Sequence, residues 1–271
     1  MTIAAQPASD PNVTDPNICL LTAMLRLRRF EEKAGMLYAL GTLAVSCPLG
    51  IGQEGAIAGL SASLDAGDSL LALQARPTIE LALGASPAAA FQRMIDASSD
   101  ASATSALVRL PGEEVRRLPR NEAIAAASGR NGPIVVLAGD AGELANLLPE
   151  LDARVLPVLM IPADRRPANY DLPAGWTLRE CDGSSAAGVR EALMSARRDR
   201  FIAVSILTPP YAGHARGGSR RSQERRDMED PIARLRRHLI GEGRLREAEA
   251  AELEAAVRYE IAAAARGLSV S

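Results

Sequence analysis

The residues best suited to chemistry are two histidines and one glycine-bearing turn. His214 lies in the run Tyr211-Ala212-Gly213-His214, and a histidine that titrates near neutral pH can act as a general acid or base. Glycine and arginine are dense in the segment that follows, residues 215–226, so we expect a mobile, solvated loop there. His238 lies among arginines in a helical stretch and is expected at the surface.

The turn Gly139-Asp140-Ala141-Gly142 joins an apolar, β-branched run at residues 133–137 to a helical stretch that ends near residue 148. Strand, turn and helix in this order form the unit from which parallel sheets are built. Asp beside Gly after a strand is common in helix capping, so we favour a capping role for Asp140 over a ligand role. Binding of an anionic small molecule at residues 139–142 is an alternative.

Composition argues against several classes of function. Cys19, Cys47 and Cys181 lie far apart without CxxC spacing, so they indicate neither a zinc site nor a disulfide framework, and we expect Cys47 and Cys181 to be small buried side chains. The 31 basic and 33 acidic residues nearly balance, which gives no indication of a nucleic-acid partner. No apolar run approaches the roughly twenty residues that cross a bilayer, so a soluble, cytoplasmic protein is expected.

Alternating strand and helix patterns position these residues. The expected fold is α/β, a doubly wound and mostly parallel sheet flanked by helices, with an exposed loop at 98–106 and a helical tail at 230–266. Residues 1–17 are expected to form a flexible tail and residues 18–271 a single domain. Strands are expected at residues 69–73, 133–137, 154–161, 176–181 and 201–207. Helices are expected at residues 21–38, 53–64, 83–97, 121–128, 184–197 and 246–265, with another starting at 230.

The first of these helices is the most informative stretch of the chain. Its apolar residues recur at helical spacing, so one face should pack on the core and Gly41 should end the helix. Its charged residues are expected to remain in water; these are Arg26, Arg28, Arg29, Glu31 and Glu32.

Two further motifs follow that helix, Cys47-Pro48-Leu49 and Gly50-Ile51-Gly52-Gln53-Glu54-Gly55. Together with Arg28-Arg29-Phe30-Glu31-Glu32-Lys33, they closely resemble the opening of the alpha subunit of thiamine-diphosphate-dependent 2-oxo acid dehydrogenases, the group of pyruvate, branched-chain and acetoin dehydrogenases. The runs Cys181-Asp182-Gly183 and Asp230-Pro231-Ile232 also resemble that family. The region from about residue 98 to 130 does not, and is shortened and rebuilt.

The resemblance implies an abbreviated thiamine-diphosphate-binding fold and a set of site residues. It places Gly139, Asp140 and Gly142 at the cofactor and makes Asp140 and Asp164 the candidate ligands of magnesium, which prefers oxygen ligands. It also places His214 near the active site, at the start of a regulatory loop. Thiamine diphosphate and magnesium are therefore the expected cofactors, if the chain binds any.

Several positions depart from the family pattern. Gln74 and Ala75 stand where the family has a Tyr-Arg pair, and Pro77 stands where it has a histidine. Arg76 is displaced by one residue, so alternation along the strand should turn its side chain away. Pro48 replaces another histidine, and proline can neither donate nor transfer a proton.

Three hypotheses follow. The first is a divergent alpha-like subunit of a pyruvate dehydrogenase-like enzyme, with a degenerate cofactor site and a structural or regulatory role. The second is an active enzyme that decarboxylates a 2-oxo acid or oxidises acetoin. The third is an anion-binding module of remodelled fold. The resemblance implies a beta-type partner in a hetero-oligomer, because the family assembles as an alpha-beta heterotetramer; self-association is the other expectation.

Overall fold

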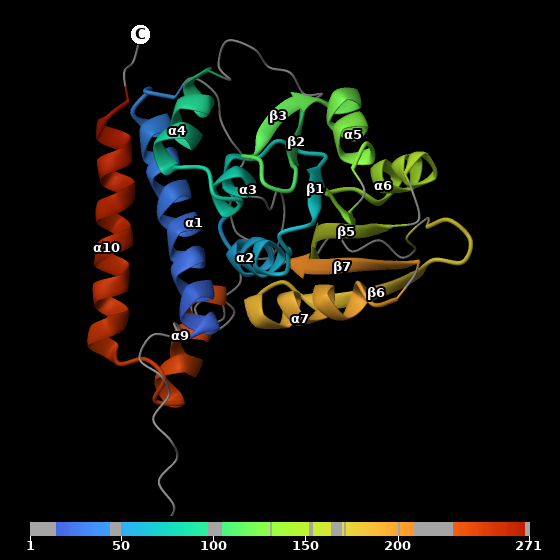
Figure 1. Ribbon diagram of the computed structural model, residues 1–271. Helices are drawn as coiled ribbons and strands as arrows, with labels where there is room; N and C mark the ends of the chain where they lie inside the picture. Colours follow the sequence, from blue (N-terminus) through green and yellow to red (C-terminus); the bar gives the residue numbers. More distant parts are fainter. Residues whose placement is uncertain are drawn as a thin grey trace, which may run out of the picture.

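The computed structural model describes residues 15–43, 50–96, 105–130, 132–151, 154–163, 170, 172–199, 201–208 and 230–268. They form an α/β fold built on a seven-stranded sheet of order β3-β2-β1-β4-β5-β7-β6 (Figure 1). This confirms the expected fold class. The expected single domain of residues 18–271 stays a prediction, and most of the expected loop 98–106 lies outside the described residues.

Five of the strands run parallel to their neighbours, and two more extend the sheet beside β1 through antiparallel pairs, the first with β1 and the second with the first. The strands are β1 (Ser69–Ala72), β2 (Ser105–Arg109), β3 (Arg116–Pro119), β4 (Ile134–Ala138), β5 (Val155–Pro162), β6 (Thr177–Asp182) and β7 (Ile202–Thr208). The parallel strands β1, β4, β5, β6 and β7 confirm the five expected ones. The expectation of a loop as far as residue 106 is wrong for its last two residues, Ser105 and Ala106, which begin β2 and pair with β3.

The helices agree with the expected pattern in most places. They are α1 (Pro16–Ala39), α2 (Glu54–Ala62), α3 (Pro77–Ala82), α4 (Pro87–Asp96), α5 (Arg120–Ser128), α6 (Ala141–Leu147), a 3-10 turn (Leu148–Glu150), α7 (Ala186–Ala196), α9 (Pro231–Gly241) and α10 (Glu247–Arg266). Residues 16 and 17 belong to α1 and not to the expected tail, because the Asp15 carboxylate caps this helix. Within the described ranges, no helix combines the length and apolarity needed to cross a bilayer.

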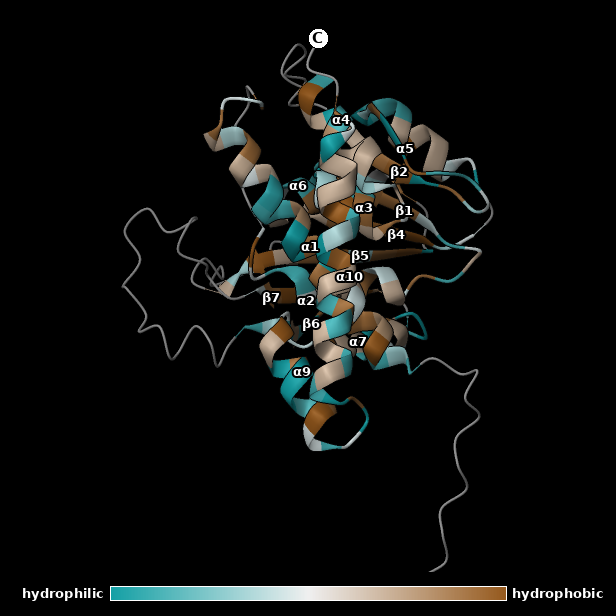
Figure 2. Cartoon of the chain, turned by 90° about the vertical axis from the view of Figure 1, so that its left-hand side faces the viewer, coloured by the Kyte–Doolittle hydropathy of each residue, from teal (hydrophilic) through white to brown (hydrophobic). Residues whose placement is uncertain are grey.

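The sheet is covered on both faces, which gives three layers (Figure 1). Side chains alternate along the strands, so Leu70 and Val135 pack with α1, α2 and α7, while Leu71 and Val136 pack with α5 and α6. Figure 2 shows β5 and β7 in brown, whereas α1 and α10 alternate between brown and teal. Strands buried on both faces are typical of parallel sheets, and the amphipathic helices supply the polar surface.

Helices α1 and α10 run parallel, although they lie at opposite ends of the sequence. Arg244, which precedes α10, pairs with Asp15 at the start of α1 at 2.6 Å. Farther along both helices, Arg26 donates to both oxygens of Glu260, at 2.7 and 3.1 Å. The C-terminal helix therefore covers the outer side of the first helix (Figure 1).

Helix α2 approaches α7 closely through two glycines. A Cβ added to Gly55 would lie 2.5 Å from the carbonyl oxygen of Gly183, and one added to Gly59 would lie 2.5 Å from that of Ala186. Both separations are shorter than van der Waals contact. Glycine at these positions thus lets α2 lie directly on the turn and helix that follow β6.

Candidate functional site

The carboxyl ends of β1 and β4 form a topological switch point, here called the switch-point crevice, because the chain leaves these neighbouring parallel strands toward opposite faces of the sheet. Helix α3 follows β1 and buries Ile79 and Leu81 on the α1 face. Helix α6 follows β4 and buries Leu144 and Leu147 on the opposite face. Ligands of open α/β sheets bind at such a topological switch point. Gly139, Asp140 and Gly142 lie at this switch point, and their role in binding a cofactor stays a prediction.

Gln74 lies over the glycine of this crevice. A Cβ added to Gly139 would lie 2.7 Å from Nε2 of Gln74, so the amide fills the space beside the turn. In the resembled family this position belongs to a Tyr-Arg pair, whose charged donors can bind a diphosphate. An amide brings no charge to the same place.

The arginines nearest the crevice are already paired within the chain. Arg120 contacts Glu143 of α6 at 2.5 Å and donates to the carbonyl oxygen of Leu73 at 3.2 Å. Arg117 pairs at 3.0 Å with Glu80, which is only 1% exposed and also pairs with Arg93 at 2.9 Å. Arg117 and Arg120 thus each contact a carboxylate of the same chain, and Arg117 shares Glu80 with Arg93.

Asp140 has the capping role that the sequence analysis favoured. Its Oδ1 accepts a hydrogen bond from the amide of Glu143 at 2.9 Å, at the start of α6. The described residues contain no group of three or more His, Cys, Asp or Glu side chains that could hold a metal ion. The other candidate ligand, Asp164, and the candidate acid or base, His214, lie outside the described residues, as does the arginine-rich segment 215–226.

At this switch point the described residues offer one of the two candidate magnesium ligands, Asp140, while the other, Asp164, lies outside the described residues. Magnesium requires several oxygen ligands, and one capping carboxylate supplies at most its remaining oxygen. A diphosphate requires cationic donors that are free to bind it, and the nearby arginines are engaged. No catalytic step through this cofactor follows from the described residues.

A second polar site, here called the buried charge cluster, joins α1, α2 and α9. It consists of Arg28, Glu31, Glu54 and Asp230. Arg28 contacts Glu54 Oε1 at 2.5 Å and Asp230 Oδ2 at 2.7 Å. Its side chain is 14% exposed, and those of Glu54 and Asp230 are 2% and 12% exposed. Burial alone would lower the pKa of Arg28, but the two carboxylates outweigh it and raise that pKa.

Each carboxylate of the cluster also receives backbone amides. Glu54 Oε2 accepts from the amide of Gly52 at 2.9 Å. Asp230 caps α9, because its Oδ1 accepts from the amides of Ile232 and Ala233 at 3.0 and 2.9 Å. Arg28 thus joins the N-termini of two helices to the middle of α1.

Glu31 is the unusual member of the cluster. It is 5% exposed; its Oε1 accepts from the amide of Gly50 at 2.6 Å, and its Oε2 has no hydrogen-bond partner among the described residues. Burial raises the pKa of Glu31 to about 7; the Gly50 amide opposes this shift, and the charge of Glu54 adds to it. Glu31 can therefore hold a proton at neutral pH.

Arg76 contacts the edge of this cluster. Its Nη1 donates to Gln53 Oε1 at 2.7 Å, and a Cβ added to Gly50 would lie 2.3 Å from its Nη2. The expectation that Arg76 turns away from the position of the lost Tyr-Arg pair stays a prediction. Cys47 and Pro48, near Gly50 in sequence, lie outside the described residues.

The expectation that Arg28 and Glu31 remain in water is wrong. Arg28 pairs with Glu54 and Asp230, and Glu31 accepts a hydrogen bond from the Gly50 amide, so the buried face of α1 includes both residues. Spacing carried a signal for Glu31, which lies four residues after Leu27 and three before Ala34, both buried. Arg28 carried the same signal, because it lies four residues after the buried Met24, but its partners come from α2 and α9 and could not be read from α1.

The remaining predicted side chains have ordinary structural roles. His238 is at the surface as expected, with its side chain 55% exposed and its Nε2 3.4 Å from Glu242. Cys181 is partly buried, and burial, together with the neighbouring charge of Asp182, raises the pKa of its thiol to about 11. A thiol that stays protonated at neutral pH is a poor nucleophile.

No protein-family model matches this chain. A 48-residue stretch is 48% identical to the pyruvate dehydrogenase E1 component subunit alpha of Rhizobium meliloti (strain 1021), and a 49-residue stretch is 53% identical to the protein of the same name from Zymomonas mobilis. Each match covers 18% of this chain and 14% of the relative. A third, from Rickettsia felis, is 48% identical over 48 residues and covers 15% of the relative. The chain thus spans a small part of these relatives, and the similarity shows a family-level relation over a short segment.

Proposed function

We propose that this chain is a divergent alpha-like partner subunit of a pyruvate dehydrogenase-like 2-oxo acid dehydrogenase in the cytoplasm. Its role is structural or regulatory, and its own thiamine diphosphate site is degenerate. The relatives support the first part, because each is named as a subunit alpha of the E1 component. A subunit of this kind pairs with a beta-type chain, and that pairing would bury its exposed apolar side chains.

The observation that carries the second part is the state of the switch-point crevice. Gln74 fills the space beside Gly139, and Arg117 and Arg120 are held by carboxylates of this chain. Among the described residues, a diphosphate entering here would have to displace the Gln74 amide and would find Arg117 and Arg120 already in ion pairs. Asp140 meanwhile retains a complete capping role that needs no metal.

The test is a calorimetric titration of thiamine diphosphate with magnesium into the chain, alone and mixed with a beta-type subunit from the same organism. We expect no saturable binding to the chain alone. Size-exclusion chromatography with light scattering should show a complex of the two subunits. If the chain ignores the beta-type subunit and remains alone, the partner-subunit proposal fails.

The alternative is an active enzyme with substituted ligands, and the 53% identity over 49 residues to a pyruvate dehydrogenase E1 component subunit alpha favours it. Saturable cofactor binding by the mixture, with decarboxylation of pyruvate, would replace our proposal by this one. Asp140→Asn is the matched variant for that case. Asparagine caps a helix as well as aspartate but removes the charge that a magnesium ligand supplies, so only the active enzyme would lose cofactor affinity.

A further inference from the structure

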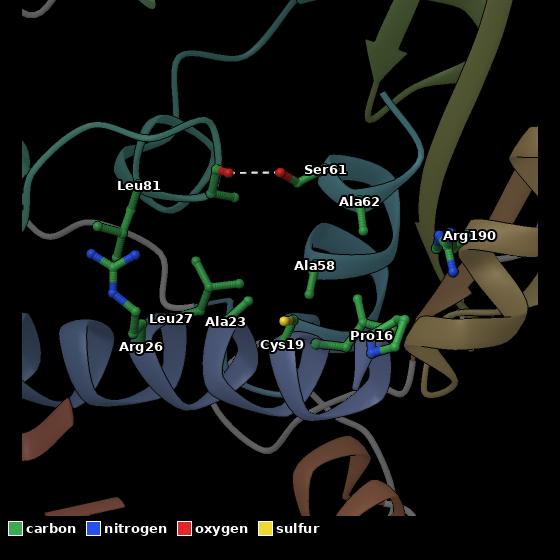
Figure 3. Close-up of a pocket in the computed structure, with 12 residues that line it drawn as sticks. Pro16, Cys19, Ala23, Arg26, Leu27, Ala58, Ser61, Ala62, Leu81 and Arg190 are labelled. Carbon is green, nitrogen blue, oxygen red and sulfur yellow. Dashed lines mark hydrogen bonds between the residues drawn. The ribbon is translucent and has the colours of Figure 1, made fainter. Parts of the chain in front are cut away.

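A separate cavity of about 450 Å³ lies between α1, α2, α3 and α7, on the α1 face of the sheet (Figure 3). Cavities of roughly 300–1,000 Å³ with mostly apolar walls are typical of small-molecule sites. This one shares no lining residue with the crevice at the ends of β1 and β4. It is therefore a site that the proposed function leaves unassigned.

Small side chains create the cavity. Ala23 of α1 faces Ala58 and Ala62 of α2, so the two helices leave a gap that longer side chains would fill. The one hydroxyl in the wall, Ser61, donates to the carbonyl oxygen of Ala82 at 2.7 Å and so ties α2 to α3. The walls thus offer an apolar surface with its hydroxyl already engaged.

The charges at the cavity are all positive. Two arginines line it, Arg26 and Arg190, and no acidic residue does. Arg26 is held by Glu260. Arg190 has neither an ion pair nor a hydrogen bond within the described part of the chain, and Figure 3 places it at the opposite end of the cavity from Arg26. A partly buried guanidinium without a partner is a strong donor for a carboxylate.

We propose that this cavity binds a medium-chain carboxylic acid. The alkyl chain would lie along the alanines and Leu81, and the carboxylate would accept hydrogen bonds from Arg190. The positive lining excludes cationic amphiphiles, and the engaged hydroxyl of Ser61 leaves Arg190 as the anchor for the polar end. This inference does not depend on the proposed function, because it rests on different residues and a different ligand.

The test is isothermal titration of the full chain with sodium hexanoate, octanoate and decanoate. Affinity should rise about fourfold for each methylene that is buried, until the cavity is full. Octanol, which has a similar chain without the charge, should bind about tenfold more weakly than octanoate. Absence of saturable octanoate binding, or equal affinity for octanoate and octanol, would overturn the proposal.

Two variants locate the ligand. Arg190→Gln should weaken octanoate about tenfold and remove its advantage over octanol, while Arg198→Gln, which removes an exposed charge outside the cavity, should change neither affinity. Ala23→Leu, at a half-buried helical position, should reduce binding of decanoate most by filling the cavity. Unchanged octanoate affinity in Arg190→Gln would contradict the site. Circular dichroism checks that each variant is folded.

The rim of the cavity provides a reporter that does not depend on mutating its walls. Cys19 is an exposed free cysteine at the cavity, so bound octanoate should slow its alkylation by N-ethylmaleimide. Cys19→Ser identifies the labelled thiol. If saturating octanoate does not slow the alkylation of Cys19, the proposal is overturned. If octanoate affinity falls as a dimer forms at high protein concentration, a second copy of the chain occupies the cavity, and the proposal is overturned as well.

Discussion

Two residues of one short segment contact the two polar sites of this protein. Arg76 contacts the edge of the buried charge cluster, and Gln74, two residues earlier, fills the space beside Gly139 in the switch-point crevice. The cluster keeps its charges buried, paired and joined to helix ends. In the crevice, Asp140 is exposed and caps a helix, and its neighbours are neutral or already paired. The comparison teaches that the family-like sequence of residues 28–55 supplies a buried charge network that joins three helices, whereas the described part of the crevice holds exposed or paired polar groups.

Loss of Arg28 should have the largest effect on stability. Arg28→Ala leaves Glu54 and Asp230 buried without their cation, so the free energy of unfolding should fall by about 3–5 kcal/mol. Arg26→Ala is the matched control, because its pair with Glu260 is 33% and 40% exposed and should cost at most about 1 kcal/mol. Urea unfolding measures both. Equal decreases in the free energy of unfolding for the two variants would mean that the buried charge cluster stabilises the fold no more than the exposed ion pair does.

Titration of Glu31 should have the next largest effect. The folded-state pKa of about 7 lies above the ordinary value of 4.5, so between these pH values the folded chain holds a proton that the unfolded chain releases. The contribution of Glu31 to the free energy of unfolding is therefore fully present below about pH 4.5. It falls by at most about 1.4 kcal/mol per pH unit as the pH rises to 7.

Glu31→Gln isolates this contribution, because glutamine keeps an acceptor for the Gly50 amide but cannot ionise. The difference in unfolding free energy between variant and wild type should shift in favour of the variant from pH 5 to pH 8. Urea unfolding at both pH values measures it. A difference that stays constant would show that Glu31 does not titrate in this range.

The close approach of α2 to α7 should have a smaller effect. In Gly55→Ala the new methyl group would lie 2.5 Å from the Gly183 carbonyl oxygen, so α2, which carries Glu54, must shift, at a cost of about 1–3 kcal/mol. The control is Gly241→Ala, where no atom lies within 4 Å and a helix former should be neutral or stabilise by up to about 1 kcal/mol. Thermal unfolding compares the two, and similar shifts would refute the steric argument.

The crevice should give the smallest effect. Asp140→Ala removes a helix cap and should cost about 1 kcal/mol, while Asp140→Asn should be nearly neutral. Both results should be independent of added magnesium in thermal unfolding. If magnesium stabilises the wild-type chain but not Asp140→Asn, Asp140 is a magnesium ligand. The crevice would then bind a metal in addition to capping a helix, and the contrast with the buried charge cluster would be weaker.

Sequence patterns predicted most of the fold, because buried parallel strands and amphipathic helices have periodicities that do not depend on distant residues. The five parallel strands and α1 are examples. Strand β3 was not predicted, because it is only partly buried and its two arginines give it no apolar pattern. Helix α3 escaped because it is six residues long, too short for a periodic signal.

The candidate site was less predictable. Local sequence sufficed for Asp140 as a cap, since its partner lies three residues away. The cluster depends on Arg28 reaching Asp230, 202 positions later in the chain, and no local pattern encodes such a pairing. The position of Gln74 likewise depends on Gly139, which lies 65 residues later in the chain and comes near Gln74 only because β1 and β4 pair in the sheet.

The parallel pairing of α1 with α10 bears on how the chain folds during synthesis. The hydrogen bond from Arg244 to Asp15 spans 229 positions and that from Arg26 to Glu260 spans 234, so α1 leaves the ribosome long before its partner exists. Until then its outer face stays uncovered in every nascent intermediate. Contacts of such high sequence separation slow folding and lengthen exposure to aggregation, so completion of this fold must await the translation of α10.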